Sequence, residues 1–133
     1  MVIKELEYLI KRSDLPLDSL EINDEETHGV FSYRVPSELV ERDDFTLILL
    51  NDIRSLHDEY GGDHATQLLK RFQIQIWYKR NVDADLFEWK LHELLESHGF
   101  REIENLGHDV DEETNQLKVE LRYEININKP TLY

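Results

Sequence analysis

The sequence has no cysteine, only three prolines and only five glycines among its 133 residues. The missing thiols exclude a disulfide framework, a thiolate metal site and a cysteine nucleophile. The one glycine pair, Gly61-Gly62, lacks the further glycines and the Lys-Ser/Thr pair of a phosphate-binding loop. We therefore interpret this pair as a flexible point in a loop.

Basic residues and long apolar runs are also scarce. The chain has 15 Lys and Arg against 29 Asp and Glu, which gives a net charge of −14. Nucleic acids and anionic membranes attract clustered basic side chains, so we expect neither as a partner. The longest apolar run, residues 47–50, is far shorter than the ~20 residues that span a bilayer. Charged residues interrupt residues 1–12, unlike a signal peptide, so we expect a soluble protein made in the cytosol.

The residues that are present predict one α+β domain over residues 1–133, a length that suits a single core. Apolar residues at helical spacing predict a short N-terminal helix before Pro16. Alternation over 72–79 and 117–125 predicts two strands. Between them, residues 83–98 form the clearest helical pattern, with Asp83 as the N-cap and Gly99 at the C-terminal end. We expect a mixed or antiparallel sheet packed with the N-terminal helix and this one main helix.

The remaining segments have weaker patterns. Residues 17–29 suggest a brief strand followed by an exposed acidic loop, and residues 30–35 and 45–50 suggest two further strands. The polar stretch 51–64 predicts a long mobile loop with a helical turn near 53–57. Residues 101–108 resemble a weak strand, and 109–115 a polar turn.

The sequence contains no complete set of catalytic or metal-binding residues at a recognisable spacing. His92 and Glu96 lie one helical turn apart, but a zinc site requires further ligands. The acids after Asp109 superficially resemble a calcium loop ending at Glu120, yet Thr114 stands where that loop requires glycine. We interpret this segment as a solvated hairpin tip or a charged contact surface. No serine has the glycine context of a nucleophile elbow, so we predict no enzyme, cofactor or metal.

Two tryptophans stand out against this background. Trp77 interrupts the polar face of its predicted strand, and Trp89 lies beside the main apolar stripe of the predicted helix. Tryptophan is enriched both at the rim of cores and at protein interfaces. Each residue therefore has two open interpretations, core packing and a subunit interface.

Specific stretches carry a family resemblance. They are residues 72–78 (Phe-Gln-Ile-Gln-Ile-Trp-Tyr), residues 94–100 (Leu-Leu-Glu-Ser-His-Gly-Phe) and the hairpin that closes on 117–125, preceded by a helix and a Pro-containing extended segment. The chain resembles the tail terminator, or minor tail, proteins of long-tailed (siphovirus) phages and of prophages in Gram-positive bacteria. This resemblance implies a mixed α/β domain in a ring of six subunits that caps the tail tube and meets the head connector. The implied partners are other copies of the chain, the tail tube protein and the head-tail connector protein, and the implied location is the virion tail after synthesis in the bacterial cytoplasm. The resemblance supplies no catalytic residue.

Two further hypotheses follow from the acidic character. In such a ring, the acidic loops face the lumen, where like charge keeps passing DNA from adhering; they comprise Asp24, Glu25, Glu26, Asp109, Asp111, Glu112 and Glu113. The Gly61-Gly62 loop and the sheet edges then supply the subunit interfaces. The alternative function is a small acidic adaptor or inhibitor that mimics nucleic acid by charge, although the alternating charge signs along 117–125 count against it. A third hypothesis is a small hydrolase or a metal-dependent nuclease, but the sequence shows no set of residues that would form its active site.

Overall fold

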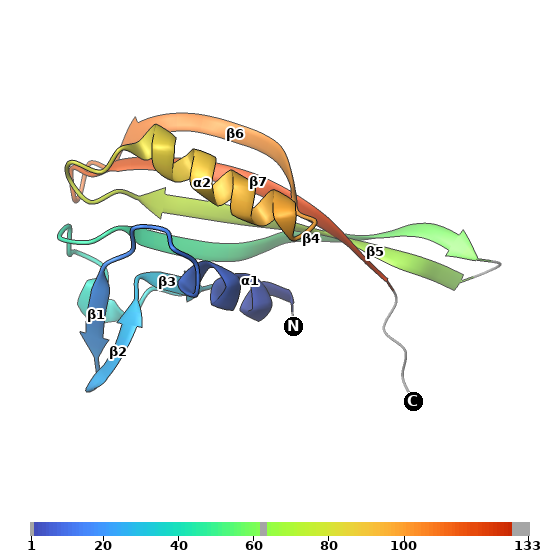
Figure 1. Cartoon of the computed structure of the whole chain (residues 1–133), viewed down its shortest axis with the longest axis horizontal. Helices are drawn as coiled ribbons and strands as arrows, with labels where there is room; N and C mark the ends of the chain where they lie inside the picture. Colours follow the sequence, from blue (N-terminus) through green and yellow to red (C-terminus); the bar gives the residue numbers. More distant parts are fainter. Residues whose placement is uncertain (1, 62–63, 129–133) are drawn as a thin grey trace.

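A five-stranded sheet with the order β3-β4-β5-β7-β6 forms the centre of the computed structural model, which describes residues 2–61 and 64–128 (Figure 1). Its strands are β3 (Val30–Ser32), β4 (Leu47–Gly61), β5 (His64–Trp77), β6 (Arg101–Val110) and β7 (Leu117–Asn128). The short β3 runs parallel to β4, and all the other neighbours are antiparallel. The predicted α+β class with a mixed sheet is confirmed.

Both helices cover the same face of this sheet. Helix α1 (Val2–Lys11) lies against β3 and β4, and α2 (Ala84–Ser97) runs along the side of the sheet that contains β5, β7 and β6 (Figure 1). One apolar cluster joins helices and strands; its members include Ile3, Leu6, Ile10, Ile48, Phe72, Ile74, Phe87, Leu91, Leu95, Leu121 and Tyr123. Helical spacing and two-residue alternation bring these side chains together, as the sequence predicts.

The opposite face is covered only near one end of the sheet. There Leu47 and the half-buried Trp77 pack with Leu20, Leu39 and Phe45 in a second apolar cluster. The covering segments are the hairpin of β1 (Ser19–Ile22) and β2 (Glu25–His28) and the short 3₁₀ helix η1 (Ser37–Leu39). The rest of this face has no helix over it among the described residues.

Helix α2 has the predicted ends. The Asp83 carboxylate accepts a hydrogen bond from the Leu86 amide at 3.1 Å, which satisfies a donor that has no partner within the helix. At the other end, Gly99 adopts a φ of +89°, and the Phe100 amide donates to the Leu95 carbonyl at 3.0 Å. Many helices end in this way, with a residue in the left-handed conformation and a hydrogen bond from the following amide back to a carbonyl of the last helical turn.

The Asp83→Ala variant tests this cap. Removing a helix N-cap acceptor costs about 0.5–2 kcal/mol, so we expect a loss of about 1 kcal/mol in the free energy of unfolding. Urea titration followed by circular dichroism measures it. Asp83→Ser, which restores an acceptor, is the control, and equal stability of the alanine variant and the wild type would show that the cap contributes nothing.

The prediction of a long loop over 51–64 is wrong. Strand β4 continues to Gly61, and β5 begins at His64, so the predicted helical turn near 53–57 is also replaced by extended chain. Register pairs such as Ser55 with Lys70 and Asp58 with Gln67 show that an antiparallel backbone ladder holds this arm together. Main-chain pairing needs no alternation of apolar residues, which is why the sequence pattern misses it. Gly62 of the predicted glycine-pair site lies outside the described residues.

The exposed loop expected around residues 23–26 is also shorter than predicted. Asn23 and Asp24, with φ values of 52° and 65°, form the tight turn of the β1–β2 hairpin, and Glu25 and Glu26 already belong to β2. Two successive residues with positive φ are the mark of a hairpin turn that matches strand twist. Asn and Asp tolerate this conformation better than most residues, and this explains why the pair stands at the turn.

Candidate functional site

Strand β6 is an open edge of the sheet. It pairs with β7 on one side, and no described strand pairs with its other side. All ten of its residues are exposed, and three of them are large and apolar: Ile103, Leu106 and Val110 are 44%, 46% and 49% exposed. An unpaired edge presents a row of backbone donors and acceptors to any strand that can lie beside it.

The inner side of β6 is tied to helix α2. Glu88 is the centre of this contact, with its side chain only 12% exposed. Its Oε2 accepts from the Tyr78 hydroxyl at 2.7 Å and lies 2.6 Å from His108 Nε2, while Oε1 accepts from Asn105 Nδ2 at 3.3 Å. Burial and the bond to Glu88 raise the pKa of the Tyr78 hydroxyl. These bonds hold the inner side of β6 against helix α2. The outer edge of the strand is therefore kept in a fixed position.

Two bulges break the regular ladder of β6. The register with β7 shifts between Glu102 and Glu104 and again between Asn105 and His108, where Gly107 has a φ of +85°. A bulge locally increases twist and re-aims the side chains of an edge strand. Together with the acids on the strand, the bulges restrict which strand can pair with it.

A second open edge lies on the other side of the sheet. Strand β3 pairs with β4 only at Ile48, Leu49 and Leu50. Next to this segment the Tyr33 hydroxyl donates to Asp52 at 2.7 Å. Beyond that point, residues 53–61 of β4 pair with β5 alone among the described strands, in an arm that projects past both helices (Figure 1).

The face without helices carries charges that are paired across the strands. Glu124 on β7 lies 3.2 Å from Arg71 on β5 and 3.4 Å from Arg101 on β6. Arg122 lies 3.6 Å from Glu104 and 3.2 Å from Glu120. Such partly exposed pairs add little stability, but they neutralise this face.

The structure brings the two predicted acidic clusters to the same end of the molecule. Asp24 lies at the tip of the β1–β2 hairpin, and Asp111 lies in the turn between β6 and β7, together with Glu112 and Glu113. Asp109 precedes that turn on β6. Both segments lie at the end of the sheet opposite the projecting arm, so Gly61 is remote from them (Figure 1).

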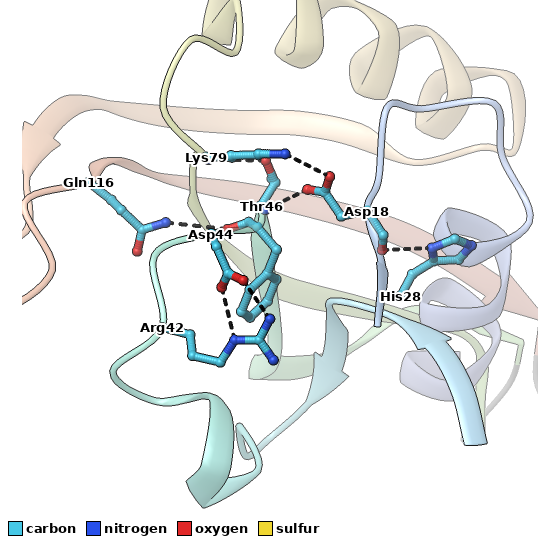
Figure 2. A network of polar contacts seen from close by, with 8 residues as sticks. Asp18, His28, Arg42, Asp44, Thr46, Lys79 and Gln116 are labelled. Atoms are coloured by element: carbon cyan, nitrogen blue, oxygen red, sulfur yellow. Dashed lines mark hydrogen bonds and ion pairs between the residues drawn. The ribbon is translucent and has the colours of Figure 1, made fainter. Parts of the chain in front are cut away.

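A polar network holds this acidic end together (Figure 2). The Asp18 carboxylate accepts from the Thr46 amide and contacts Lys79 Nζ, both at 3.2 Å. These two contacts tie the start of the β1–β2 hairpin to the sheet, and His28 Nδ1 donates to the Asp18 carbonyl at 3.0 Å across the base of the hairpin. The buried Gln116 amide donates to the carbonyl of Phe45 at 3.3 Å. Sequence patterns missed these residues because each bond joins segments that are distant in the chain.

The two tryptophans have different surroundings. Trp77 packs in the second apolar cluster, and its Nε1 donates to Asp111 Oδ2 at 2.7 Å. Trp89 is 61% exposed on α2, with its ring stacked near that of His92 at 6.2 Å between centroids. Trp77 therefore has a packing role, whereas Trp89 presents an exposed aromatic surface.

The acids that resemble a calcium loop shape a turn. Asp111 Oδ1 accepts from the amide of Glu113 at 2.8 Å and from that of Thr114 at 3.3 Å, which is a side-chain cap of the chain reversal. The bond from Trp77, followed by these amide bonds, lowers the pKa of the Asp111 carboxyl. Its charged form is thus stabilised by the fold.

Acidification tests this contact through the Asp111→Asn variant. A lowered carboxyl pKa contributes stability that is present above the ordinary value of about 3.9 and is lost as pH falls through the folded-state value. We expect the variant to be less stable at pH 7, and the two proteins to converge in acid. Urea titrations at a series of pH values measure this. If the stability curves of Asp111→Asn and the wild type stay parallel from pH 7 into acid, the assignment is wrong.

The described residues contain no group of three His, Asp or Glu side chains placed to hold a metal ion. His92 Nε2 and Glu96 lie 2.7 Å apart on α2, as their spacing predicts. Neither α1 nor α2 has the length and apolar character of a membrane-spanning helix.

Comparison with known proteins gives one family. The family described as "Protein of unknown function (DUF806)" matches residues 18–128, which include every strand of both sheets. No curated protein matches the chain. Since the match covers most of the sequence, the chain belongs to the DUF806 family of proteins of unknown function.

Proposed function

We propose that the chain is a structural subunit of a phage tail, which assembles into a ring, caps the tail tube and joins it to the head connector. The observation that carries this proposal is the edge strand β6, exposed along all ten residues and fixed from behind by Glu88. Proteins that act alone protect such edges by shortening or covering them, or with charges and bulges. Strand β6 has charges and two bulges, but it is neither short nor covered by another described strand. A fixed edge with three exposed apolar side chains suits a surface that a neighbour covers.

Residues 72–78 and 94–100 resemble tail terminator proteins. This resemblance is the reason why we propose a phage tail as the assembly. The structural features that support it are a rigid sheet, open edges on both sides and an acidic end. In a ring, an acidic end that faces the lumen would repel the DNA that passes through. The partners in this proposal are other copies, the tail tube protein and the connector protein.

Charge mimicry is the weaker alternative. A mimic of nucleic acid requires a surface of unpaired acids that attracts a basic protein. On the helix-free face, Glu124 and Glu120 are paired with arginines. This pairing counts against charge mimicry.

Two measurements test the proposal. Light scattering on the purified chain, alone and with tail tubes, measures whether it forms a ring or binds the tube end. Deleting the gene in a phage that encodes the chain should give tails of uncontrolled length, because an uncapped tube continues to grow. Normal tails after deletion, together with a monomer that never binds tubes, would exclude the function.

Neutralising the acidic end tests its place in the lumen. Replacing Asp24, Glu112 and Glu113 with their amides should leave assembly intact and slow genome delivery, because DNA would meet less repulsion. Assembly is measured by light scattering and delivery by plaque formation. The control replaces Glu93 and Glu96 on the exposed surface of α2. Delivery at the wild-type rate would contradict the lumen assignment.

A further inference from the structure

We infer that β6 of one copy pairs with the outer edge of β4, residues 53–61, in the next copy, so that one sheet continues from subunit to subunit. This inference rests on the proposed function and names the surfaces that form the ring. Adding a strand to an open edge is a common way for proteins to recognise an extended segment.

The two edges fit each other in extent and position. Strand β6 has ten residues, and the part of β4 whose outer edge pairs with no described strand spans residues 53–61. They lie on opposite sides of the same sheet, so a contact between them joins two different surfaces. Contacts of this head-to-tail kind produce a ring when the rotation between neighbours closes.

The directions of the strands are also compatible. Successive antiparallel pairs make β4 and β7 run one way and β5 and β6 the other. Rotation about the ring axis leaves the sense of each strand along that axis unchanged. Strand β6 therefore meets β4 of the next copy antiparallel, the arrangement in which backbone bonds are perpendicular to the strands.

The required stagger falls in the range of closed sheets. Asn105 is level with Leu121, which is level with Ile74 and then Leu50. Because of the bulge at Ile53, Ser55 and His57 of β4 are level with Lys70 and Leu68 of β5. Pairing the middle of β6 with residues 55–57 of β4 therefore shifts neighbouring copies by ~13–20 Å along the strands. The distance from β4 to β4 of the next copy, three strand spacings within one copy and one between copies, is ~19 Å. The strands then tilt by ~35–47° from the ring axis, close to the ~35–45° of closed barrels.

Pairing of β6 with itself would give a closed two-fold dimer and no ring, and one register is also disfavoured by charge. In a symmetric antiparallel pair centred on Ile103, Glu102 of one copy would face Glu104 of the other. Like charges directly opposite on neighbouring strands are destabilising. Such a pair would also leave the edge of the β4 arm unused.

Disulfide cross-linking tests the pairing cleanly because the chain has no native cysteine. One cysteine is placed at Glu104, and a second moves one residue at a time through residues 53–59 of β4. Directly opposed residues on antiparallel strands have Cα atoms ~4.5–5.5 Å apart, within reach of a disulfide. We expect a ladder of dimers and higher multimers on oxidation, strongest at one β4 position and at positions two residues away, and its loss on reduction.

Two controls separate the outcomes. Glu104→Cys alone should stay monomeric on a non-reducing gel, and a cross-linked dimer from it would establish β6–β6 pairing and overturn the inference. Glu104→Cys combined with Glu93→Cys on exposed α2 measures random collision. Rings that form without any β6–β4 cross-link would contradict this inference and leave the proposed function standing. A chain that neither assembles nor cross-links, with or without tail tubes, contradicts both.

Discussion

Combined substitution of Ile103→Lys and Leu106→Lys is expected to abolish self-association while leaving the fold intact. Both side chains are exposed on the free edge, at 44% and 46%, and neither belongs to the two apolar clusters of the core. Surface substitutions of this kind usually alter the free energy of unfolding by no more than about 0.5 kcal/mol. Lysine on an edge strand, however, is a recognised block to pairing, because a partner strand would bury its charge.

Light scattering measures assembly of this variant, and thermal unfolding measures its stability. The matched control carries Leu86→Lys and Trp89→Lys on α2, where the wild-type side chains are 49% and 61% exposed. The control should assemble like the wild type. If the control disrupts assembly and the β6 variant does not, the interface lies on the helix and the assignment to β6 is wrong.

Replacing Phe72 with alanine is expected to have the largest effect on stability. Phe72 is fully buried on β5, the central strand of the sheet, and its ring meets that of Phe100 edge-on at 6.1 Å between centroids. Phe→Ala substitutions in cores cost about 3–5 kcal/mol, through lost burial and the cavity that remains. Because domains are stable by only about 5–15 kcal/mol, this loss is expected to remove a large part of the total.

Urea unfolding followed by fluorescence measures this cost. Phe72→Leu, which keeps most of the volume, should lose much less, and Trp89→Ala at an exposed position should lose about 0.5 kcal/mol or less. A cost below about 1.5 kcal/mol for Phe72→Ala would mean that the core collapses around the gap. The contact between β5 and Phe100 would then matter less than the geometry suggests.

The elements that sequence patterns predict well are those with one buried face. Alternation in β5 and β7 and the helical stripe of α2 follow from burial of Ile74, Leu121 and Leu91. Asp83 and Gly99 are recognisable because capping chemistry is local. These features place the centre of the fold without knowledge of the tertiary structure.

The arm of β4 and the site on β6 could not be predicted in this way. The arm is held by backbone pairing with β5, which leaves no periodic apolar signal. Ile103, Leu106 and Val110 on β6 are irregularly spaced because bulges interrupt the strand and no face of it is buried. The signal that could have identified β6 is a strand-like segment without apolar alternation directly after a helix. Such a segment has no buried face, as expected for an exposed edge strand.

The acidic end shows a third kind of limit. The sequence places Asp24 in an exposed loop and Asp111 in a polar turn, but their common location depends on the sheet order. Asp18 and Lys79 join segments 61 residues apart in the chain, and only the folded structure reveals that contact. Local physics thus predicts the elements, whereas long-range pairing decides which of them meet.

Cryo-electron microscopy of tails assembled with this chain tests the central claim most directly. We expect a closed ring at one end of the tail tube, with β6 of each copy beside β4 of the next. A tube end that lacks the chain, or a ring in which the outer edge of β6 faces solvent, would contradict it.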